Sequence, residues 1–595
     1  MEAALDSFAV RGYREAMRLP FFSQRRNVAS DAVPPATAVS KSPLEVVLQY
    51  HEETKHHYHR FARSLGYLDW ANQPDPFRRF SDARLVSLPL LEQSDLPAYR
   101  DVFSPGLVPS VTVDLNSISR LFRNSLAISA WKHHENTPWA LRVNPSSGNL
   151  HPTEGYGIFG DLTPELRAGV YHYAPQIHAL EQRTELASDM FASLSNDFPA
   201  GSFFVGLTSI HWREAWKYGE RAYRYCQHDL GHAIAAIRLS AAALGWQLLL
   251  LDELSDQEVA LLLGLHVAEN FEQAEDEYPH CIAVVVPSAD SIGNAATIRP
   301  EVIQKIADCS WTGRANRLSE SHMDWQIVNV VAEAASKLRT EICELRPSLM
   351  KFSPPDEIVS MEKIIQQRRS AVAMDGHAFL GSRRFFGMLA RVISDANAVP
   401  FDVFRRSELA NPRIHLAIFV HRVTGIVPGL YFLIRKTGEL SRIQESMHSN
   451  FLWQQAPGCP PEIPLYCLLQ GDFKRVAASV SCGQEIAADG AFSLGMIAEF
   501  ENPLKTIGSW IYPRLFWEAG LIGQILYLEA EASGVRATGM GCYFDDPMHG
   551  LLGLKGNVFQ SLYHFSVGGP VDDVRIGTEP AYGDSVATIS IPDLP

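Results

Sequence analysis

The chain of 595 residues has no closely spaced pair of cysteines. Its eight cysteines are scattered without a Cys-x-x-Cys motif, which argues against a zinc site and a disulfide framework and favours a reducing compartment. The zinc-protease pattern His-Glu-x-x-His also fails, because Lys55 stands where a second histidine would have to follow His51 and Glu52. No metal site is therefore predicted.

Positive charge and long apolar runs are scarce as well. The chain has 52 Lys and Arg against 67 Asp and Glu, a formal charge of −15 at pH 7, whereas nucleic-acid binding needs clustered basic residues. The longest apolar run, residues 241–251, is interrupted by Trp246 and Gln247 and is too short to cross a bilayer. No Gly-x-Gly-x-x-Gly follows a strand pattern, so no dedicated dinucleotide domain is indicated. We expect neither a nucleic-acid partner nor a membrane span.

What is present is the composition of a large folded protein. Hydrophobic residues make up 46% of the chain and aromatic residues 10%, and this length needs at least two domains. The first 42 residues carry several arginines and then a Pro/Ala/Ser/Val stretch, which predicts a disordered or targeting tail. The acidic Glu2, Asp6 and Glu15 count against a transit peptide, so we expect a cytoplasmic protein, with an organelle such as the plastid left open.

The stretch 142–154, Arg-Val-Asn-Pro-Ser-Ser-Gly-Asn-Leu-His-Pro-Thr-Glu, is the most informative part of the chain. Its two prolines bracket small and hydroxylated residues, which predicts an irregular turn with N–H groups, hydroxyls and an amide facing outward. The apolar pattern at 156–159 predicts a strand that holds the turn in place. A rigid loop rich in donors suits the polar edge of a flat heteroaromatic ligand, although Pro-Ser-Ser-Gly is equally typical of an ordinary turn.

A second constellation occupies residues 215–232. On a helix Lys217, Arg221 and Arg224 follow one another at about one turn each, so their charges repel unless carboxylates or an anionic ligand face them. Asp229 and Glu220 could be those carboxylates, and a solvated helix start is the other interpretation. Residues 233–251 read as an apolar helix at the centre of a domain or at a subunit interface.

The chain then repeats part of itself. The sequence Gly429-Leu-Tyr431 resembles Gly169-Val-Tyr171, and residues 520–534 resemble 231–245, with a small-residue helix that ends at glycine in each case. The unequal spacing predicts an old duplication rather than a short-period array. We therefore expect one domain at 43–290, a helical connector at 291–360 and a second domain at 361–595.

These motifs, in this order, resemble the FMN-dependent nitroreductase superfamily and within it the SagB/ThcOx type of peptide azoline dehydrogenases. The resemblance rests on Arg142-x-x-Pro-Ser-Ser-Gly-Asn149-x-x-Pro-x-Glu154 followed by Gly169-Val-Tyr-His-Tyr173, and it covers most of 45–290 and, more thinly, 360–577. It implies an α+β fold of two tandem nitroreductase-like domains, each with a mostly antiparallel central sheet flanked by helices. Because superfamily sites lie across a twofold interface, the two domains are expected to form a pseudo-dimer within one chain.

The resemblance also implies a cofactor site for FMN. Half one has the ring loop but no Arg-Arg-Ser, and half two has the Arg-Arg-Ser but only Phe404-Arg-Arg-Ser407 in place of the ring loop. This complementary loss predicts a single FMN per chain. Arginine suits phosphate because its guanidinium offers two parallel donors. The implied residues are Arg142, Pro145, Ser146, Ser147 and Asn149 at the ring, Arg368, Arg369, Ser370 and Arg575 at the phosphate, and Gly539 and Gly541 at the isoalloxazine edge.

The implied reaction is hydride transfer between the flavin and a small-molecule or peptide substrate. By analogy, Lys217 and Tyr218 are the acid/base pair, and Lys217 acts as a base at neutral pH only if burial or neighbouring cations lower its pKa. An NAD(P)H-dependent nitro or quinone reductase is a second hypothesis, and a non-catalytic flavin-binding scaffold in a biosynthetic complex is a third. The substrate, the electron acceptor and further homo-oligomerisation stay open.

Overall fold

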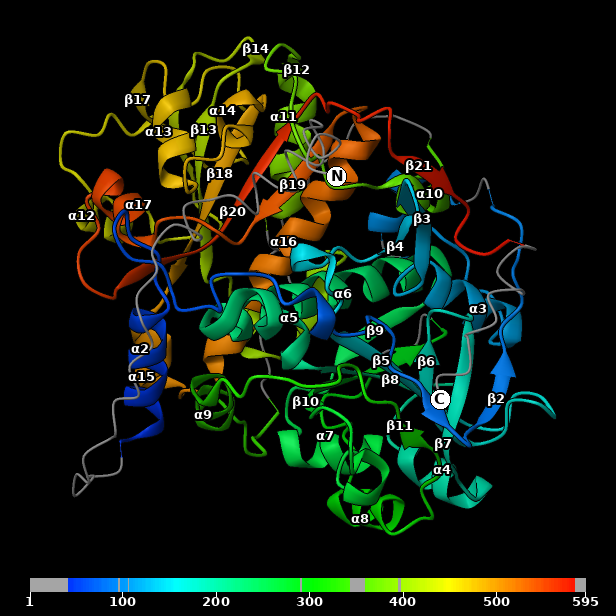
Figure 1. Ribbon diagram of the computed structural model, residues 1–595. Helices are drawn as coiled ribbons and strands as arrows, with labels where there is room; N and C mark the ends of the chain where they lie inside the picture. Colours follow the sequence, from blue (N-terminus) through cyan, green and yellow to red (C-terminus); the bar gives the residue numbers. More distant parts are fainter. Residues whose placement is uncertain are drawn as a thin grey trace.

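The computed structural model of the protein describes residues 41–94, 97–104, 106–288, 292–342, 359–393 and 398–583. These residues form an α+β fold with two seven-stranded sheets, one in each half of the chain (Figure 1). The tail predicted at 1–42 lies outside this part except for its last two residues, of which Ser42 caps the helix α2 (Pro43–Glu53). Within the described residues, no helix is both long and apolar enough to span a bilayer.

The first sheet is antiparallel throughout and lies in the first half of the chain. Its central strands β5, β6 and β8 are buried along their whole length, because helices cover the sheet. In order across the sheet, the strands are β2 (Arg84–Ser87), β7 (Ala179–Glu185), β6 (Gly169–Ala174), β5 (Thr153–Phe159), β8 (Phe203–Ser209), β10 (Tyr278–Val286) and β9 (Gln247–Leu250).

The second sheet repeats this plan. The glycines that the sequence comparison paired take equivalent places: Gly169 and Gly429 each begin a strand, and a Cβ on either would lie 2.4 Å or 2.3 Å from a carbonyl oxygen of the next strand. Two tandem domains of one architecture are thereby confirmed. Across the second sheet the strands are β16 (Gln454–Gln455), β17 (Leu465–Gln470), β15 (Gly429–Leu433), β13 (Ile414–Val420), β18 (Phe492–Glu499), β20 (Phe559–Gly568) and β19 (Arg536–Met540).

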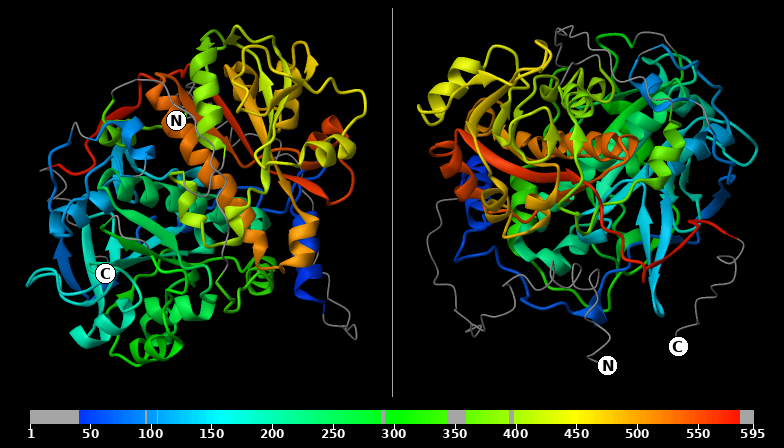
Figure 2. Two further views of the ribbon diagram at one scale, coloured as in Figure 1. Left: turned by 180° about the vertical axis from the view of Figure 1, so that it is seen from behind. Right: turned by 90° about the horizontal axis from the view of Figure 1, so that it is seen from above.

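Two long helices, α6 (Ala222–Ala243) and α16 (Ile511–Ala532), pack against each other between the sheets (Figures 1 and 2). They cross where each has a glycine at the same place along its length: a Cβ on Gly231 would lie 2.3 Å from the carbonyl oxygen of Trp517, and one on Gly520 would lie 2.2 Å from that of His228. One hydrophobic cluster continues through both halves at this crossing. The halves therefore form a pseudo-dimer within one chain.

The helix predicted at 233–251 is wrong at its C-terminal end. The helix α6 ends at Ala243, Gly245 turns the chain with a φ of 72°, and residues 247–250 form the edge strand β9. A left-handed glycine is a common helix stop, and an apolar run shorter than one helix fits a buried strand equally well.

An element from the end of each half packs against the other half. The helix α2 packs beside α15 (Glu501–Thr506) of the second half (Figure 2), and the imidazole of His51 lies within hydrogen-bonding distance of Tyr512 Oη at 3.2 Å and of Gln560 Oε1 at 3.1 Å. In return, β21 (Gly577–Glu579) pairs with β3 (Ile128–His134) of the first half, and β3 pairs with β4 (Thr137–Arg142). The histidine-rich sequence from Pro43 to Leu65 is typical of one helix, but α2 already ends at Glu53.

The remaining helices lie around the sheets and the central helix pair, and the stretch predicted as a connector contributes α8, β11 and α9. The strand β11 pairs with β1 of the first half. These elements are β1 (Phe80–Ser81), α3 (Leu115–Arg123), α4 (Ser188–Ser195), α5 (His211–Tyr218), α7 (Asp256–Leu263), α8 (Pro300–Ala307), β11 (Arg314–Ala315), α9 (Gln326–Ala334), α10 (Met361–Gln367), β12 (Leu380–Gly381), α11 (Ser382–Val392), β14 (Val423–Thr424), α12 (Leu440–Ser446), α13 (Lys474–Val480), α14 (Ile486–Asp489) and α17 (Asp545–Leu552).

Candidate functional site

The Pro-Ser-Ser-Gly-Asn loop connects β4 to β5 at the interface of the two halves. It contains a short 3₁₀ turn, η4 (Ser147–Asn149), in which Gly148 and Asn149 both have a φ of 60°. The carboxylate of Asp229 on α6 accepts hydrogen bonds from the Ser147 N–H at 3.0 Å and the Ser147 hydroxyl at 2.9 Å. Asn149 Nδ2 donates to the carbonyl of Ala140 at 2.9 Å. These donors face protein acceptors rather than outward, unlike the prediction.

Lys217 and Tyr218 stand at the end of α5, directly against this loop. A Cβ built on Gly148 would lie 2.7 Å from Tyr218 Oη and 3.1 Å from Lys217 Nζ, so only glycine lets the loop approach the pair this closely. The helix ends there because Gly219 has a φ of 54°. Burial lowers the pKa of Lys217 to about 8, against the opposing effect of Glu214. A lysine with such a pKa can exchange a proton near neutral pH.

Glu214, one helical turn before Lys217, is a buried carboxyl that the sequence interpretation did not single out. Neither of its carboxylate oxygens has a hydrogen-bond partner among the described residues. Burial raises the pKa of Glu214 well above its usual range, and the charge of Asp229 adds to this rise while Lys217 opposes it. Burial also raises the pKa of Asp229 to about 7, against hydrogen bonds from Ser146 and Ser147. The spacing of three residues from Lys217 was the available signal.

The Arg368-Arg369-Ser370 motif of the second half reaches the ring loop of the first half. The buried Arg368 guanidinium donates from Nε to the carbonyl of Val143 at 3.1 Å and from an η nitrogen to that of Arg142 at 3.1 Å. Its other η nitrogen has no hydrogen-bond partner among the described residues. The structure thus joins motifs that are more than 200 residues apart in the sequence.

Ser370 and Arg369 are held by the end of α16. The hydroxyl of Ser370 lies 2.9 Å from Tyr527 Oη, which accepts the Gly539 N–H at 2.9 Å. The N–H of Arg369 donates to Glu531 at 3.0 Å, and its guanidinium donates to the carbonyl of Gln366 at 2.7 Å. The Arg369 guanidinium also donates to the hydroxyl and the carbonyl of Ser129 in the first half, at 3.4 Å and 3.5 Å.

Gly539 lies near the end of β19, and Gly541 directly follows this strand. At both positions a tyrosine side chain lies against the backbone. A Cβ on Gly539 would lie 2.0 Å from Tyr563 Oη, and one on Gly541 would lie 1.9 Å from the ring of Tyr225. The Tyr225 ring in turn lies 4.3 Å from that of Tyr218, centroid to centroid. These glycines bring aromatic faces next to the candidate acid/base pair.

Arg575 does not join this cluster. It lies on an exposed segment after β20, and its guanidinium pairs with Asp573 at 2.6 Å. The sequence placed it near the phosphate by resemblance alone. The pairing with the neighbouring carboxylate neutralises the charge that a phosphate contact would need.

In the histidine-rich segment at the end of α2, the ammonium group of Lys55 lies where a metal ion could otherwise bind. Lys55 Nζ lies 2.7 Å from a carboxylate oxygen of Glu52 and 3.1 Å from one of Asp546. His57 lies 3.4 Å from the same aspartate. Among the described residues, Glu52, His57 and Asp546 are the set whose spacing would suit a metal ion, and the ammonium group already neutralises it.

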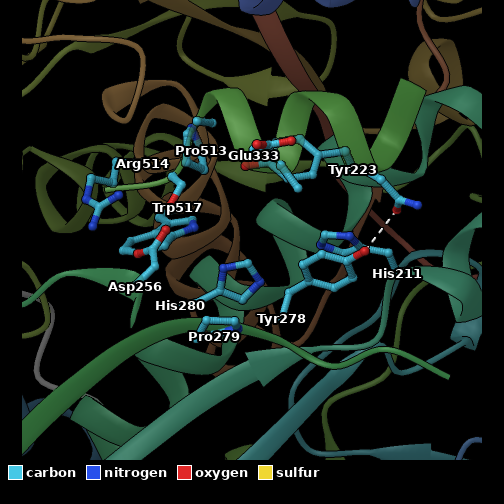
Figure 3. A pocket seen from close by; sticks show the side chains of 14 residues that line it. His211, Tyr223, Asp256, Tyr278, Pro279, His280, Glu333, Pro513, Arg514 and Trp517 are labelled. Carbon is cyan, nitrogen blue, oxygen red and sulfur yellow. Dashed lines mark hydrogen bonds between the residues drawn. The ribbon is translucent and has the colours of Figure 1, made fainter. Parts of the chain in front are cut away.

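A separate cavity of about 350 Å³ lies beneath α9, between the starts of α5 and α16 (Figure 3). Among the described residues, neither ring nitrogen of His211 has a hydrogen-bond partner, and the Nε2 of His280 has none either. Burial lowers the pKa of both histidines, that of His211 to about 3, so both are neutral. The His211 ring stacks on Tyr278 at 4.0 Å, and Trp517 forms another wall. None of the residues predicted to bind flavin lines this cavity.

Comparison with known proteins places the fold. No protein-family model matches the chain. The crystal structure of a protein from Anabaena variabilis named as a nitroreductase superposes with a TM-score of 0.64 at 22% identity, covering 88% of this chain and 99% of that one. The protein therefore has a nitroreductase-like fold, as the sequence predicted.

Two curated relatives match shorter segments. The trifolitoxin-processing protein TfxB of Rhizobium leguminosarum bv. trifolii is 37% identical over 111 residues, which are 17% of this chain and 29% of TfxB. The nitroreductase-named protein MJ1384 of Methanocaldococcus jannaschii is 29% identical over 132 residues, 21% of this chain and 65% of that protein. Both matches cover less than two thirds of the relative's length.

Proposed function

We propose that the protein is an FMN-dependent oxidoreductase of the nitroreductase superfamily that transfers hydride between the flavin and an organic substrate. The observation that carries this proposal is the meeting of Arg368 from the second half with the carbonyls of Arg142 and Val143, immediately before the ring loop of the first half. In a twofold flavoprotein these two motifs belong to opposite sides of one site. The proposal assigns one such site to each chain.

The polar atoms around the loop fit this cofactor. FMN carries an anionic phosphate, hydroxyls and a ring edge with both donors and acceptors, and buried polar atoms are normally paired. One η nitrogen of Arg368 and the Nε of Arg142 are donors without a partner among the described residues, while Asn144 Oδ1 is an acceptor without one. Arg368 would hold the phosphate, and the loop would hold the ring. The bound flavin supplies the two-electron chemistry.

The chain's own contribution is to hold a proton acceptor at a fixed place. Lys217 has a pKa of about 8, so a substantial neutral fraction exists at physiological pH. Its Nζ and Tyr218 Oη both lie against Gly148, which positions them on one side of the loop. Lys217 or Tyr218 takes the proton that leaves the substrate as hydride departs, and the rigid loop keeps the distance constant.

The local match to TfxB, a protein named for processing trifolitoxin, supports the SagB/ThcOx-like dehydrogenase. The match to MJ1384 favours the second hypothesis, an NAD(P)H-dependent nitro or quinone reductase. The tyrosines that fill the space at Gly539 and Gly541 favour the third, a scaffold without turnover. Turnover of the FMN-loaded protein separates the two enzymes from the flavin-binding scaffold.

The test is reconstitution of the purified full chain with FMN. We expect one FMN per chain, and Arg368→Gln should weaken FMN affinity at least ~10-fold, since a buried charged donor is worth about 1.5–3 kcal/mol. Arg575→Gln is the matched control and should leave affinity unchanged, because Arg575 is exposed and paired with Asp573. Two flavins per chain would contradict the single site, a protein that takes up no FMN would overturn the proposal, and bound FMN without turnover would favour the scaffold. Reduction of the bound flavin by a thiazoline peptide or by NADPH then decides between the two enzymes.

A further inference from the structure

Two cysteines of the second half meet beside the candidate site. The Sγ atoms of Cys482 and Cys542 are 2.8 Å apart although the residues are 60 positions apart in the sequence, and both cysteines are free thiols. Cys482 is buried in the turn after α13, and Cys542 is partly exposed just after β19. Two thiols at this separation need little movement to form a bond.

The backbone around the pair is fixed by its neighbours. Cys482 has a φ of 58°, a left-handed conformation that non-glycine residues seldom adopt and that is often found at functional sites. Gln484 Nε2 donates to the carbonyls of Ser481 at 2.8 Å and of Cys542 at 2.9 Å, so one amide ties the two cysteine segments together. The surrounding structure thus holds both sulfurs in place.

The pair also touches the residues that face Lys217 and Tyr218. Cys542 follows Gly541, whose carbonyl accepts a hydrogen bond from Arg221 at 3.2 Å and whose backbone lies against the ring of Tyr225. Tyr225 packs on Tyr218. A displacement of Cys542 is therefore passed through Gly541 to the aromatic wall of the candidate site.

We propose that Cys482 and Cys542 form a redox-active dithiol that a low-molecular-weight disulfide such as oxidised glutathione converts reversibly into an intramolecular disulfide. The more accessible Cys542 attacks first: its sulfur bonds to one sulfur of the small disulfide, whose S–S bond breaks and releases one small thiol. The sulfur of Cys482 then attacks Cys542 Sγ, which forms the internal bond and releases the second small thiol. Two protein sulfurs are oxidised, two small-molecule sulfurs are reduced, and both protein protons pass to the released thiols.

Oxidation alters the candidate site because the sulfurs have to approach each other. An S–S bond is about 2.05 Å long, so the segments at 481–483 and 541–542 must close by several tenths of an ångström. Catalytic geometry is sensitive to shifts of this size. This consequence rests on the proposed function, whereas formation of the disulfide does not.

The test equilibrates the full chain with reduced and oxidised glutathione at set ratios, traps the remaining thiols by alkylation and maps the peptides by mass spectrometry. We expect a peptide pair cross-linked through Cys482 and Cys542 that disappears as reduced glutathione increases. Cys482→Ser should instead accumulate glutathione on Cys542, and Cys542→Ser should leave Cys482 reduced. Cys309→Ser, a partly exposed cysteine on another part of the molecule, is the matched control and should keep the cross-link.

Two results would overturn the proposal. The first is a wild-type chain that forms no cross-link at any ratio, and the second is glutathione that stays on Cys542 without displacement by Cys482. Because the readout is a peptide mass, it does not depend on bound flavin or on turnover. Turnover of the flavin-loaded chain should change at least ~10-fold on oxidation, whereas the same treatment should leave the turnover of Cys542→Ser unchanged, because Cys482 stays reduced in that variant. A cross-link without that change would refute the coupling to the site.

Discussion

Replacing Lys217 with methionine is expected to stabilise the protein at pH 7 while it abolishes turnover. Burial lowers the pKa of Lys217 from 10.5 to about 8, and each pKa unit corresponds to about 1.36 kcal/mol, so the protonated amine costs the folded state up to roughly 3 kcal/mol. Lys217 is partly exposed and methionine loses its remaining contacts, so the expected gain is about 1–2 kcal/mol. FMN content should stay the same.

The pH dependence provides the stricter test of this reasoning. The folded protein releases the Lys217 proton near pH 8 and the unfolded chain near 10.5, so the unfolded chain binds more protons in that window and wild-type stability gains as pH rises through it. The advantage of Lys217→Met should therefore be full at pH 7 and vanish by about pH 10.5. Urea unfolding of both proteins at each pH measures it, with the exposed Lys305→Met as control. A variant that is less stable at pH 7, or equally favoured at both pH values, would refute the argument.

Three further outcomes are expected. Turnover should rise with pH through about 8, because Lys217 accepts a proton only when neutral, and a rate profile flat from pH 6 to 9 would remove it as the base. Gly231→Ala should lower unfolding stability by at least about 2 kcal/mol, because its Cβ meets the carbonyl of Trp517, whereas Gly550→Ala, with open space around it, should not; urea midpoints measure both. The free energy of unfolding of the wild type should fall as pH rises from about 4 to 7, because burial raises the pKa of Asp229 to about 7 and the folded protein holds this proton longer than the unfolded chain. Asp229→Asn should lack this fall.

The duplicated architecture was predictable because glycine tolerates no substitute where backbones meet. Gly169 and Gly429 begin equivalent strands, and Gly231 and Gly520 mark the helix crossing, so the same residue recurs at the same structural constraint in both halves. Such positions leave a signal in a single sequence. Side-chain contacts across the interface leave none, because they depend on pairs of residues that are far apart in the chain.

The features that the sequence did not reveal are side-chain contacts between residues that are far apart in the chain. Cys482 and Cys542 have no motif spacing, and their contact exists only after β19 and the turn after α13 are folded together. The tyrosines at Gly539 and Gly541 come from β20 and α6, so the glycines in the sequence did not indicate which side chains would lie against them. The burial of Glu214 follows from the packing of α5, although its spacing from Lys217 was visible in the sequence.

The α6–α16 crossing joins two partners of a single polypeptide, so the assembly is monomolecular and dilution cannot take it apart. A homodimer built in the same way would expose its central helices whenever its concentration fell below the dissociation constant. Here a substitution in one half is not copied into the other, so Arg368 can be kept on one side while the opposite side keeps only the loop. Asymmetry of that kind is out of reach for identical subunits.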